Sequence, residues 1–288
     1  MGTVGIVTTF SMGHNKLRFK CETMKADIGI IGGSGFYSLL ENAKEIDVET
    51  DYGKPSGRIS IGRINGRGVA FLPRHGSRHS IPPHKVPYRA NIQALYDLGI
   101  RRIIATNATG SLNPKFRVGQ IVAFDQFANF TNGRIDTFFD DSVAHVGMAE
   151  PYCNELRSIA TKAARGKSLA YRDRGSVLVV NGPRFSTRAE SLFFSRQGFD
   201  LINMTQYPEA ALARERCMCY LALGIVTDYD VGLVGRKEIK PVSHSEVVAT
   251  FAKNIGNVKW LVGEMVKNIP EARKCSCARA LEGASVEV

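Results

Sequence analysis

An apolar run at residues 221–226, with the sequence LALGIV, constrains the fold most, because it ends almost at once in two carboxylates, Asp228 and Asp230. A short run of this kind, rich in branched residues and closed by a turn, predicts a strand that is buried on both faces. Such strands present ligand-binding groups at their carboxyl ends. Because side chains alternate along a strand, the two carboxylates lie on the same side. These residues alone leave open whether the pair begins a loop or belongs to a binding site.

The size and composition of the chain fit a globular protein with a full core. It has 288 residues, of which 44% are hydrophobic. No apolar run approaches the roughly 18–20 residues that cross a membrane, so no membrane partner is expected. The first twenty residues carry their basic residues after a weak apolar stretch, which argues against a secretory signal. We therefore expect the protein in the cytoplasm.

The chain is basic, with 38 Lys and Arg against 27 Asp and Glu and a formal charge of +11. This balance favours anionic partners, from phosphate and nucleotides to nucleic acid. The basic residues, however, stand singly or in pairs such as Arg101-Arg102, without a block of five. This distribution favours a solvated basic surface over a nucleic-acid face.

Six cysteines are spread unevenly along the chain, and four of them form two C-x-C pairs, Cys217 with Cys219 and Cys275 with Cys277. Neither pair has the C-x-x-C spacing of a zinc knuckle, so we expect no metal. In an ordinary cytosol these residues are free thiols by default. A structural or redox role for the pairs stays open.

Predicted strands alternate with predicted helices and no linker separates them, so we expect a single α/β domain in which helices flank a central mixed, twisted sheet. This domain spans residues 27–270, between a loosely held extension at 1–26 and a tail at 271–288. A Gly-rich turn at 32–35 follows the first strand, and a helix is expected from about Tyr37. Ser243 and Glu246 have the spacing of a capping box and begin a long packing helix.

Polar side chains follow several of the predicted strands, and one sheet would gather them at one edge. They comprise a hydroxyl after the Gly-rich turn, an Arg-His pair, a Thr-rich segment, a Met-Thr pair and the two carboxylates: Ser34, Arg74, His75, residues 106–109, Met204, Thr205, Asp228 and Asp230. Arginine offers a planar fork of donors and histidine a ring donor, which suit a small oxyanion. Phe185 and Ser186 could stack on and hydrogen-bond to a flat ring. The set fits cleavage of a substrate that phosphate attacks at one end and that is protonated at the other.

Several ordered motifs make the chain resemble the trimeric nucleoside phosphorylases, and among them those that act on 5′-methylthioadenosine. The resemblance covers about residues 27–268 and rests on the segments 30–35 (IIGGSG), 73–76 (PRHG), 88–92 (YRANI), 182–190 (GPRFSTRAE), 203–205 (NMT) with 208–209 (PE), and 227–230 (TDYD). It implies a phosphate-dependent pentosyltransferase that uses a purine nucleoside and inorganic phosphate. It implies no cofactor and no metal, and a trimer or a pair of trimers.

The resemblance also implies roles for individual residues. Phosphate would be held by Ser34, Arg74, His75, Asn107 and Thr205, ribose by Ala108 and Met204, and the base by Phe185, Ser186, Asp228 and Asp230. His145 would reach the 5′-substituent pocket of a neighbouring subunit. Asn107 stands where relatives often carry a hydroxyl or small residue. The C-terminal C-x-C resembles that of archaeal thermophilic members, in which disulfides contribute to stability.

The chemistry of base release gives Asp228 the leading role. Adenine leaves poorly until its N7 is protonated, so Asp228 is the expected proton donor or N7 partner. A carboxyl with an ordinary pKa is almost fully ionised at neutral pH, and we expect burial and Asp230 to raise the pKa of Asp228. The carboxylate of Asp230 would accept from the 6-amino group and disfavour 6-oxopurines. Two alternatives stay open: a purine nucleoside phosphorylase of broad or 6-oxo preference, and a basic nucleotide-binding protein without turnover.

Overall fold

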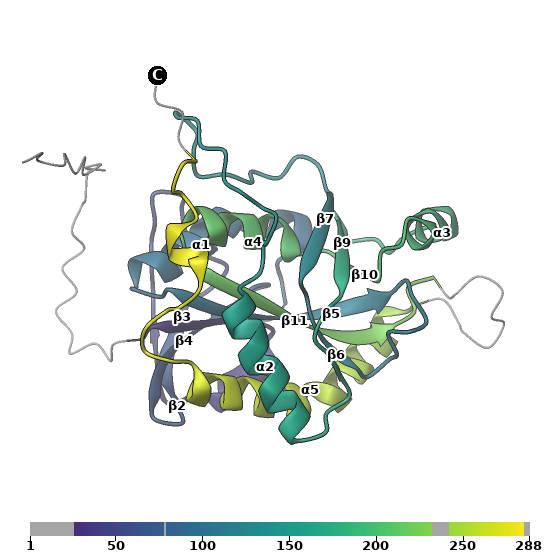
Figure 1. The fold of residues 1–288 in the computed structure, drawn as a ribbon, viewed down its shortest axis with the longest axis horizontal. Helices are drawn as coiled ribbons and strands as arrows, with labels where there is room; N and C mark the ends of the chain where they lie inside the picture. Colours follow the sequence, from purple (N-terminus) through teal and green to yellow (C-terminus); the bar gives the residue numbers. More distant parts are fainter. Residues whose placement is uncertain (1–25, 78, 232–241, 285–288) are drawn as a thin grey trace, which may run out of the picture.

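The structure, a computed structural model, describes residues 26–77, 79–231 and 242–284, apart from the side chains of Ser34 and Tyr37. In these residues eleven strands form one sheet that carries helices on both faces (Figure 1). The strands are β1 (Ile28–Gly32), β2 (Glu41–Ile46), β3 (Ile59–Ile64), β4 (Arg67–Pro73), β5 (Arg102–Ser111), β6 (Ile121–Ala123), β7 (Gln126–Phe130), β8 (Tyr171–Arg172), β9 (Ser176–Val180), β10 (Leu201–Asn203) and β11 (Cys219–Asp228). The helices are α1 (Tyr88–Asp97), α2 (Asn154–Gly166), α3 (Arg188–Arg196), α4 (Gln206–Glu215) and α5 (His244–Asn268), with short 3-10 turns η1 (Ser34–Leu39), η2 (Pro83–Lys85) and η3 (Ser276–Arg279).

The sheet is mixed and branches at β5. Its main path runs β2-β3-β4-β1-β5-β10-β9-β7, while β11 also pairs with β5 and leads to β6 and β8. The strands β4, β1, β5 and β11 are parallel, whereas β10 meets the last residues of β5 in the antiparallel sense. The predicted α/β fold with a mixed central sheet is therefore confirmed.

Successive residues of the central strands enter two different apolar layers. Ile31 and Ala222 pack in the layer that α1 and α4 cover, and Ile30 and Leu221 pack in the layer that α2 and α5 cover. Figure 1 shows the two helix pairs on opposite faces of the sheet. The helix α3 lies beside β9 and β10, where its Phe194 packs against Leu178 and Ile202. Burial on both faces explains why the strand at 221–226 is apolar throughout rather than alternating.

The carboxyl ends of the parallel strands meet at one edge. Gly32 pairs with Pro73, and the Arg74 N–H donates to the Gly32 carbonyl at 3.0 Å. On the next strands Asp228 pairs with Gly110, after a register shift that follows Val226. This edge therefore carries polar residues that follow β1 and β4, together with Asp228 at the end of β11. The residues 106–109, expected to follow a strand, lie within β5, which continues to Ser111.

One sequence-based prediction near the first strand fails, and one strand there was not predicted. The helix expected from about Tyr37 is the short 3-10 turn η1, and β2 follows it directly. The sequence of β2, ENAKEI, lacks apolar alternation because this edge strand is almost entirely exposed. By contrast, the helix predicted to begin at Ser243 is confirmed, since the Ser243 hydroxyl accepts from the Glu246 N–H at 3.3 Å.

The predicted division into extension, domain and tail stays a prediction. Residues 1–25 and 285–288 lie outside the described residues. The start of the tail contacts the body, because Arg102 donates to the carbonyls of Pro270 and Glu271 and Arg273 donates to that of Cys217. No helix in the described residues is both long and apolar enough to cross a membrane.

Candidate active site

Arg74, at the end of β4, is fixed by a buried carboxylate. Its Nε and Nη2 donate to the two oxygens of Glu209 on α4, both at 2.7 Å, and its Nη1 donates to the Thr106 carbonyl at 2.9 Å. The side chains of Arg74 and Glu209 are only 2% and 0% exposed. Burial opposes the charge of Arg74, but the attraction of Glu209 outweighs it and raises the pKa of the guanidinium. Three of five N–H groups are used, which leaves two for an anion.

A chain of buried amides extends from this pair to Thr205. Gln206 donates to the Asn107 oxygen and Asn107 donates to the Thr205 hydroxyl, each at 2.8 Å. Thr205 is the N-cap residue of α4, yet its side chain does not cap that helix. Since its hydroxyl oxygen accepts from Asn107, its own O–H is free to donate to an anion. Asn107 has one further amide hydrogen, so it orients Thr205 and can still contact a ligand.

Thr106 offers another hydrogen-bond donor, beside the backbone of Gly32. The Thr106 hydroxyl is buried, and no hydrogen-bond partner for it lies among the described residues. A Cβ on Gly32 would lie 2.5 Å from this oxygen, so glycine keeps the space beside Thr106 clear. Ser34 begins η1 two residues later. Its side chain is outside the described residues, and its phosphate contact stays a prediction.

His75 is held as a neutral ring. Its Nδ1 lies 2.8 Å from the Ile81 carbonyl, which can only accept, so Nδ1 carries the hydrogen. Burial, helped by the charge of Arg74, lowers the pKa of His75 to about 4. In the neutral ring Nε2 is therefore an acceptor. The sequence predicted His75 as a ring donor to an anion, and in this state the only ring N–H is already bonded to Ile81.

Asp228 is held on both of its oxygens at the end of β11. Its Oδ2 accepts from the Thr227 hydroxyl and its Oδ1 from the Asp230 N–H, both at 2.7 Å. A Cβ at Gly110 would lie 2.9 Å from Oδ1, so only glycine lets β5 pass this close. Burial raises the pKa of Asp228 to about 6 against the two hydrogen bonds, and the charge of Asp230 adds a smaller upward effect. The predicted direction of this shift is confirmed, with burial as its main cause.

Asp230 lies beside two serine hydroxyls. Burial raises its pKa, while Ser191 on α3 and Ser186 in the preceding loop favour its charged form. Its Oδ2 is buried, and none of the described residues hydrogen-bonds it. Its backbone adopts a left-handed φ of 50°, an uncommon conformation that clusters at functional sites. The structure thus brings Ser186 and Asp230 together, whereas the ring of Phe185 is 38% exposed.

Ala108 and Met204 stand at the open part of this edge. Ala108 is the one exposed residue of β5, whose other residues are buried. Arg134 fixes the Met204 backbone, because its Nη2 donates to the Met204 and Asn181 carbonyls at 2.8 and 3.0 Å and its Nη1 donates to that of Tyr207. The segment at residues 131–145, which contains neither a helix nor a strand, is therefore anchored to the strand ends by Arg134.

The structure does not join His145 to the other predicted site residues. Its side chain is exposed, and its backbone N–H donates to the Ala284 carbonyl at 2.7 Å, in the C-terminal segment. Within the described residues of a single chain, no hydrogen bond or ion pair joins it to Asp228 or Arg74. Its role toward a neighbouring subunit stays a prediction.

Sequence reasoning did not give roles to the residues that support the site. Glu209 holds Arg74, Tyr220 donates to Glu209 at 2.6 Å, and Gln206 is held by the Tyr152 hydroxyl at 3.1 Å. Glu209 and Gln206 lie on the buried first turns of α4, and Tyr220 lies inside an apolar strand. Charged and amide groups buried at such positions require hydrogen-bonding partners. Their occurrence at buried positions is the signal in the sequence that could have identified them as parts of the site.

The two halves of this edge differ in charge and so in what they can bind. One half presents arginine, threonine and neutral histidine to an oxyanion, and the other presents a carboxyl with a pKa near neutrality. Together they define an enzyme that can transfer a group to an oxyanion while an acid protonates the leaving group. Residues 27–267 match the family described as the phosphorylase superfamily, and the chain belongs to it.

Individual relatives cover almost the whole chain. It is 50% identical over 265 residues to S-methyl-5′-thioadenosine phosphorylase of Thermofilum pendens, a match that covers 91% of this chain and 99% of that protein. It is 44% identical over 271 residues to a purine nucleoside phosphorylase of Streptomyces coelicolor, covering 90% and 96%. Its fold is similar to that of a methylthioadenosine phosphorylase from Schistosoma mansoni in complex with adenine, with a TM-score of 0.84, 37% identity, and coverage of 91% and 99%.

The raised pKa of Asp228 has a measurable effect on stability. Between the ordinary pKa of 3.8 and about 6 the folded state binds more protons than the unfolded state, so the stability of the wild type falls as pH rises through this window. Asp228→Asn removes this loss. We expect the variant to gain roughly 1–3 kcal/mol over the wild type between pH 4 and pH 7, measured by urea unfolding. A difference in unfolding free energy that stays constant with pH would contradict the raised pKa.

Proposed function

We propose that this chain catalyses the phosphorolysis of S-methyl-5′-thioadenosine to adenine and 5-methylthioribose 1-phosphate. One observation carries the proposal: a carboxyl whose pKa burial raises to about 6 lies at the same sheet edge as a buried arginine, two of whose N–H groups bond to none of the described residues. The names of the relatives from Thermofilum pendens and Schistosoma mansoni support the choice of nucleoside.

The reaction pairs an acid with an oxyanion nucleophile. A phosphate oxygen forms the new bond to C1′ with inversion, the bond from C1′ to N9 breaks, and its electron pair stays with the base. The proton of Asp228 moves to N7 and makes the base a neutral leaving group. Arg74, Thr205 and Thr106 hold the phosphate, together with Ser34 and Asn107. Ala108 and Met204 contact the ribose, and Phe185 and Ser186 border the purine.

The neutral state of His75 indicates which group of the phosphate ion it contacts. With Nδ1–H bonded to Ile81, Nε2 accepts a hydrogen bond. The HPO₄²⁻ ion carries one O–H, which can donate to Nε2 while its other oxygens accept from Arg74 and Thr205. This arrangement orients phosphate without a second positive charge beside Arg74.

Asp230 sets the preference for the base. Its buried Oδ2, which has no partner among the described residues, can accept from a 6-amino group. A 6-oxo group at the same place would face a carboxylate. Asp230→Asn is therefore expected to lower the ratio of kcat/KM for adenosine over inosine by about 10²-fold or more, because an amide can donate to O6. Ser191→Ala, which removes a neighbouring hydroxyl from the same carboxylate, is the matched control and should change the ratio much less. An unchanged ratio in Asp230→Asn would contradict this role.

The direct test of the reaction is its dependence on phosphate. Methylthioadenosine is incubated with and without inorganic phosphate, and adenine and the sugar phosphate are measured by chromatography and phosphorus NMR. Equimolar adenine and sugar phosphate, formed only with phosphate, are expected. Release of adenine without phosphate would instead identify a hydrolase. If no adenine were released under either condition, the chain would be a binding protein without turnover.

The proposal includes an assembly of several copies in the cytoplasm. His145 is exposed, as expected of a side chain that completes the 5′-substituent pocket of a neighbouring subunit. We infer a trimer or a pair of trimers with one site per subunit, acting without a cofactor and without nucleic acid. Sedimentation equilibrium would give the number of copies. A monomer with full activity would remove the role of His145.

A further inference from the structure

Four cysteines that lie far apart in the sequence come together in the fold. The sulfur atoms of Cys153, Cys219, Cys275 and Cys277 all lie within 4.8 Å of one another, and those of Cys219 and Cys275 are 3.3 Å apart. A tetrahedral zinc ion about 2.3 Å from each of four sulfurs sets them about 3.8 Å apart. The observed spacing is therefore close to that of a four-thiolate site.

Three different segments supply these sulfurs. Cys153 is the N-cap residue of α2, Cys219 is the first residue of β11, and Cys275 and Cys277 belong to the segment that forms η3. Cys219 and Asp228 are the first and last residues of β11, so the cluster lies about 30 Å from the catalytic carboxyl. Any role of the cluster is therefore separate from base release.

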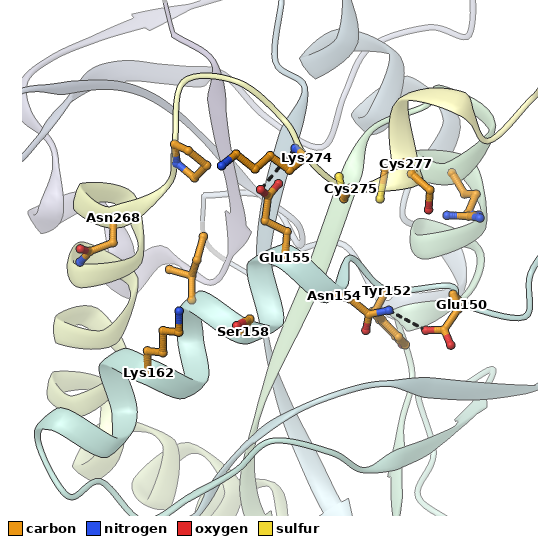
Figure 2. Close-up of a pocket in the computed structure, with 14 residues that line it drawn as sticks. Glu150, Tyr152, Asn154, Glu155, Ser158, Lys162, Asn268, Lys274, Cys275 and Cys277 are labelled. Atoms are coloured by element: carbon orange, nitrogen blue, oxygen red, sulfur yellow. Dashed lines mark hydrogen bonds between the residues drawn. The ribbon is translucent and has the colours of Figure 1, made fainter.

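The cluster is mostly buried but can be reached from solvent. Cys153, Cys219 and Cys277 are buried and Cys275 is partly exposed. Cys275 and Cys277 also line a surface hollow of about 690 Å³ (Figure 2). The hollow leads from solvent to the cluster.

We propose that Cys153, Cys219, Cys275 and Cys277 bind one Zn²⁺ ion that fastens the C-terminal segment to β11 and to the start of α2. Four soft thiolates in a closed, tetrahedral arrangement favour zinc over the hard cations that oxygen ligands bind. Binding displaces the thiol protons to solvent, so that the site carries four sulfur–zinc bonds and no redox step occurs. The spacing rule that predicted no metal considered each C-x-C pair alone, whereas the fold combines one pair with two distant cysteines.

The test uses the full-length protein and zinc itself. The protein is reduced, loaded with ZnCl₂ and desalted, and its zinc is measured by mass spectrometry. About one zinc per chain is expected for the wild type and for Cys217→Ser, a control that removes a cysteine close in sequence but outside the cluster. Cys277→Ser and Cys153→Ser are expected to lose most of it. Equal zinc in all four proteins, or none in the wild type, would overturn the proposal.

Two further measurements separate zinc from disulfides and from misfolding. Co²⁺ loaded into the wild type should give the strong visible absorption of tetrahedral thiolate coordination. This measurement needs no variant and so cannot be affected by misfolding of one. In protein purified without reductant, denatured and treated with a chelator, all six cysteines should titrate as thiols. Loss of four thiols would identify two disulfides in the cluster and overturn the proposal. Phosphate-dependent base release by each variant confirms that it is folded.

Discussion

Asp228→Ala is expected to lower kcat for methylthioadenosine by ~10²–10⁴-fold, the usual loss when a general acid is removed. The base then leaves as an anion, because the variant has no carboxyl group at this position to protonate N7. Asp228→Asn should lose less than Asp228→Ala, because an amide can donate a hydrogen bond to N7 without giving up a proton. Steady-state kinetics at saturating phosphate measure both variants.

The pH profile gives this prediction a second readout. Only protonated Asp228 can give a proton, so kcat/KM of the wild type should fall about tenfold for each pH unit above about 6. Phosphate also titrates in this range, but it does so equally for every variant. The difference between the profiles of the wild type and Asp228→Asn therefore isolates the carboxyl. Parallel profiles, or full turnover by Asp228→Ala, would remove Asp228 from its role as the acid.

Glu209→Gln is expected to cost about 3–5 kcal/mol of stability, because it leaves the buried charge of Arg74 without its partner. For a chain of this size the melting temperature should fall by on the order of 10 °C. Added phosphate should then stabilise the variant more than the wild type, because the anion becomes the main partner of Arg74. Calorimetric melting with and without phosphate measures both effects.

Tyr220→Phe provides the matched control for Glu209. It removes one hydrogen bond of 2.6 Å to the same carboxylate but leaves the ion pair intact, so it should cost only about 1–2 kcal/mol. Its response to phosphate should equal that of the wild type. If phosphate raised the melting temperatures of the wild type and Glu209→Gln equally, Arg74 would not contact phosphate.

The sequence predicts those parts of the site that lie at the ends of strands. The apolar run at residues 221–226 indicated a buried strand, and Asp228 stands at its carboxyl end as expected. Arg74 likewise follows β4, which is parallel to β1 and ends at the same edge. Such positions are predictable because a parallel sheet brings the ends of its strands together whatever the sequences between them.

The parts that the sequence did not predict depend on contacts between distant residues. Glu209 is 135 positions from Arg74, and its helix alone gives no indication of which cation it meets. The state of His75 depends on the Ile81 carbonyl, which a loop places beside Nδ1. The four-cysteine cluster joins residues 153 and 277. The strand β2 is exposed at the sheet edge and therefore lacks the apolar pattern that makes buried strands recognisable.

The central claim is that two carboxylates at the end of β11 select and protonate a 6-aminopurine while phosphate attacks the sugar. It is tested most directly by base release from methylthioadenosine, adenosine, inosine and guanosine, assayed side by side at saturating phosphate. Strong preference for methylthioadenosine, with adenosine next, is the predicted result. Preference for inosine or guanosine would place the chain with the purine nucleoside phosphorylase of Streptomyces coelicolor in function and would contradict the role given to Asp230.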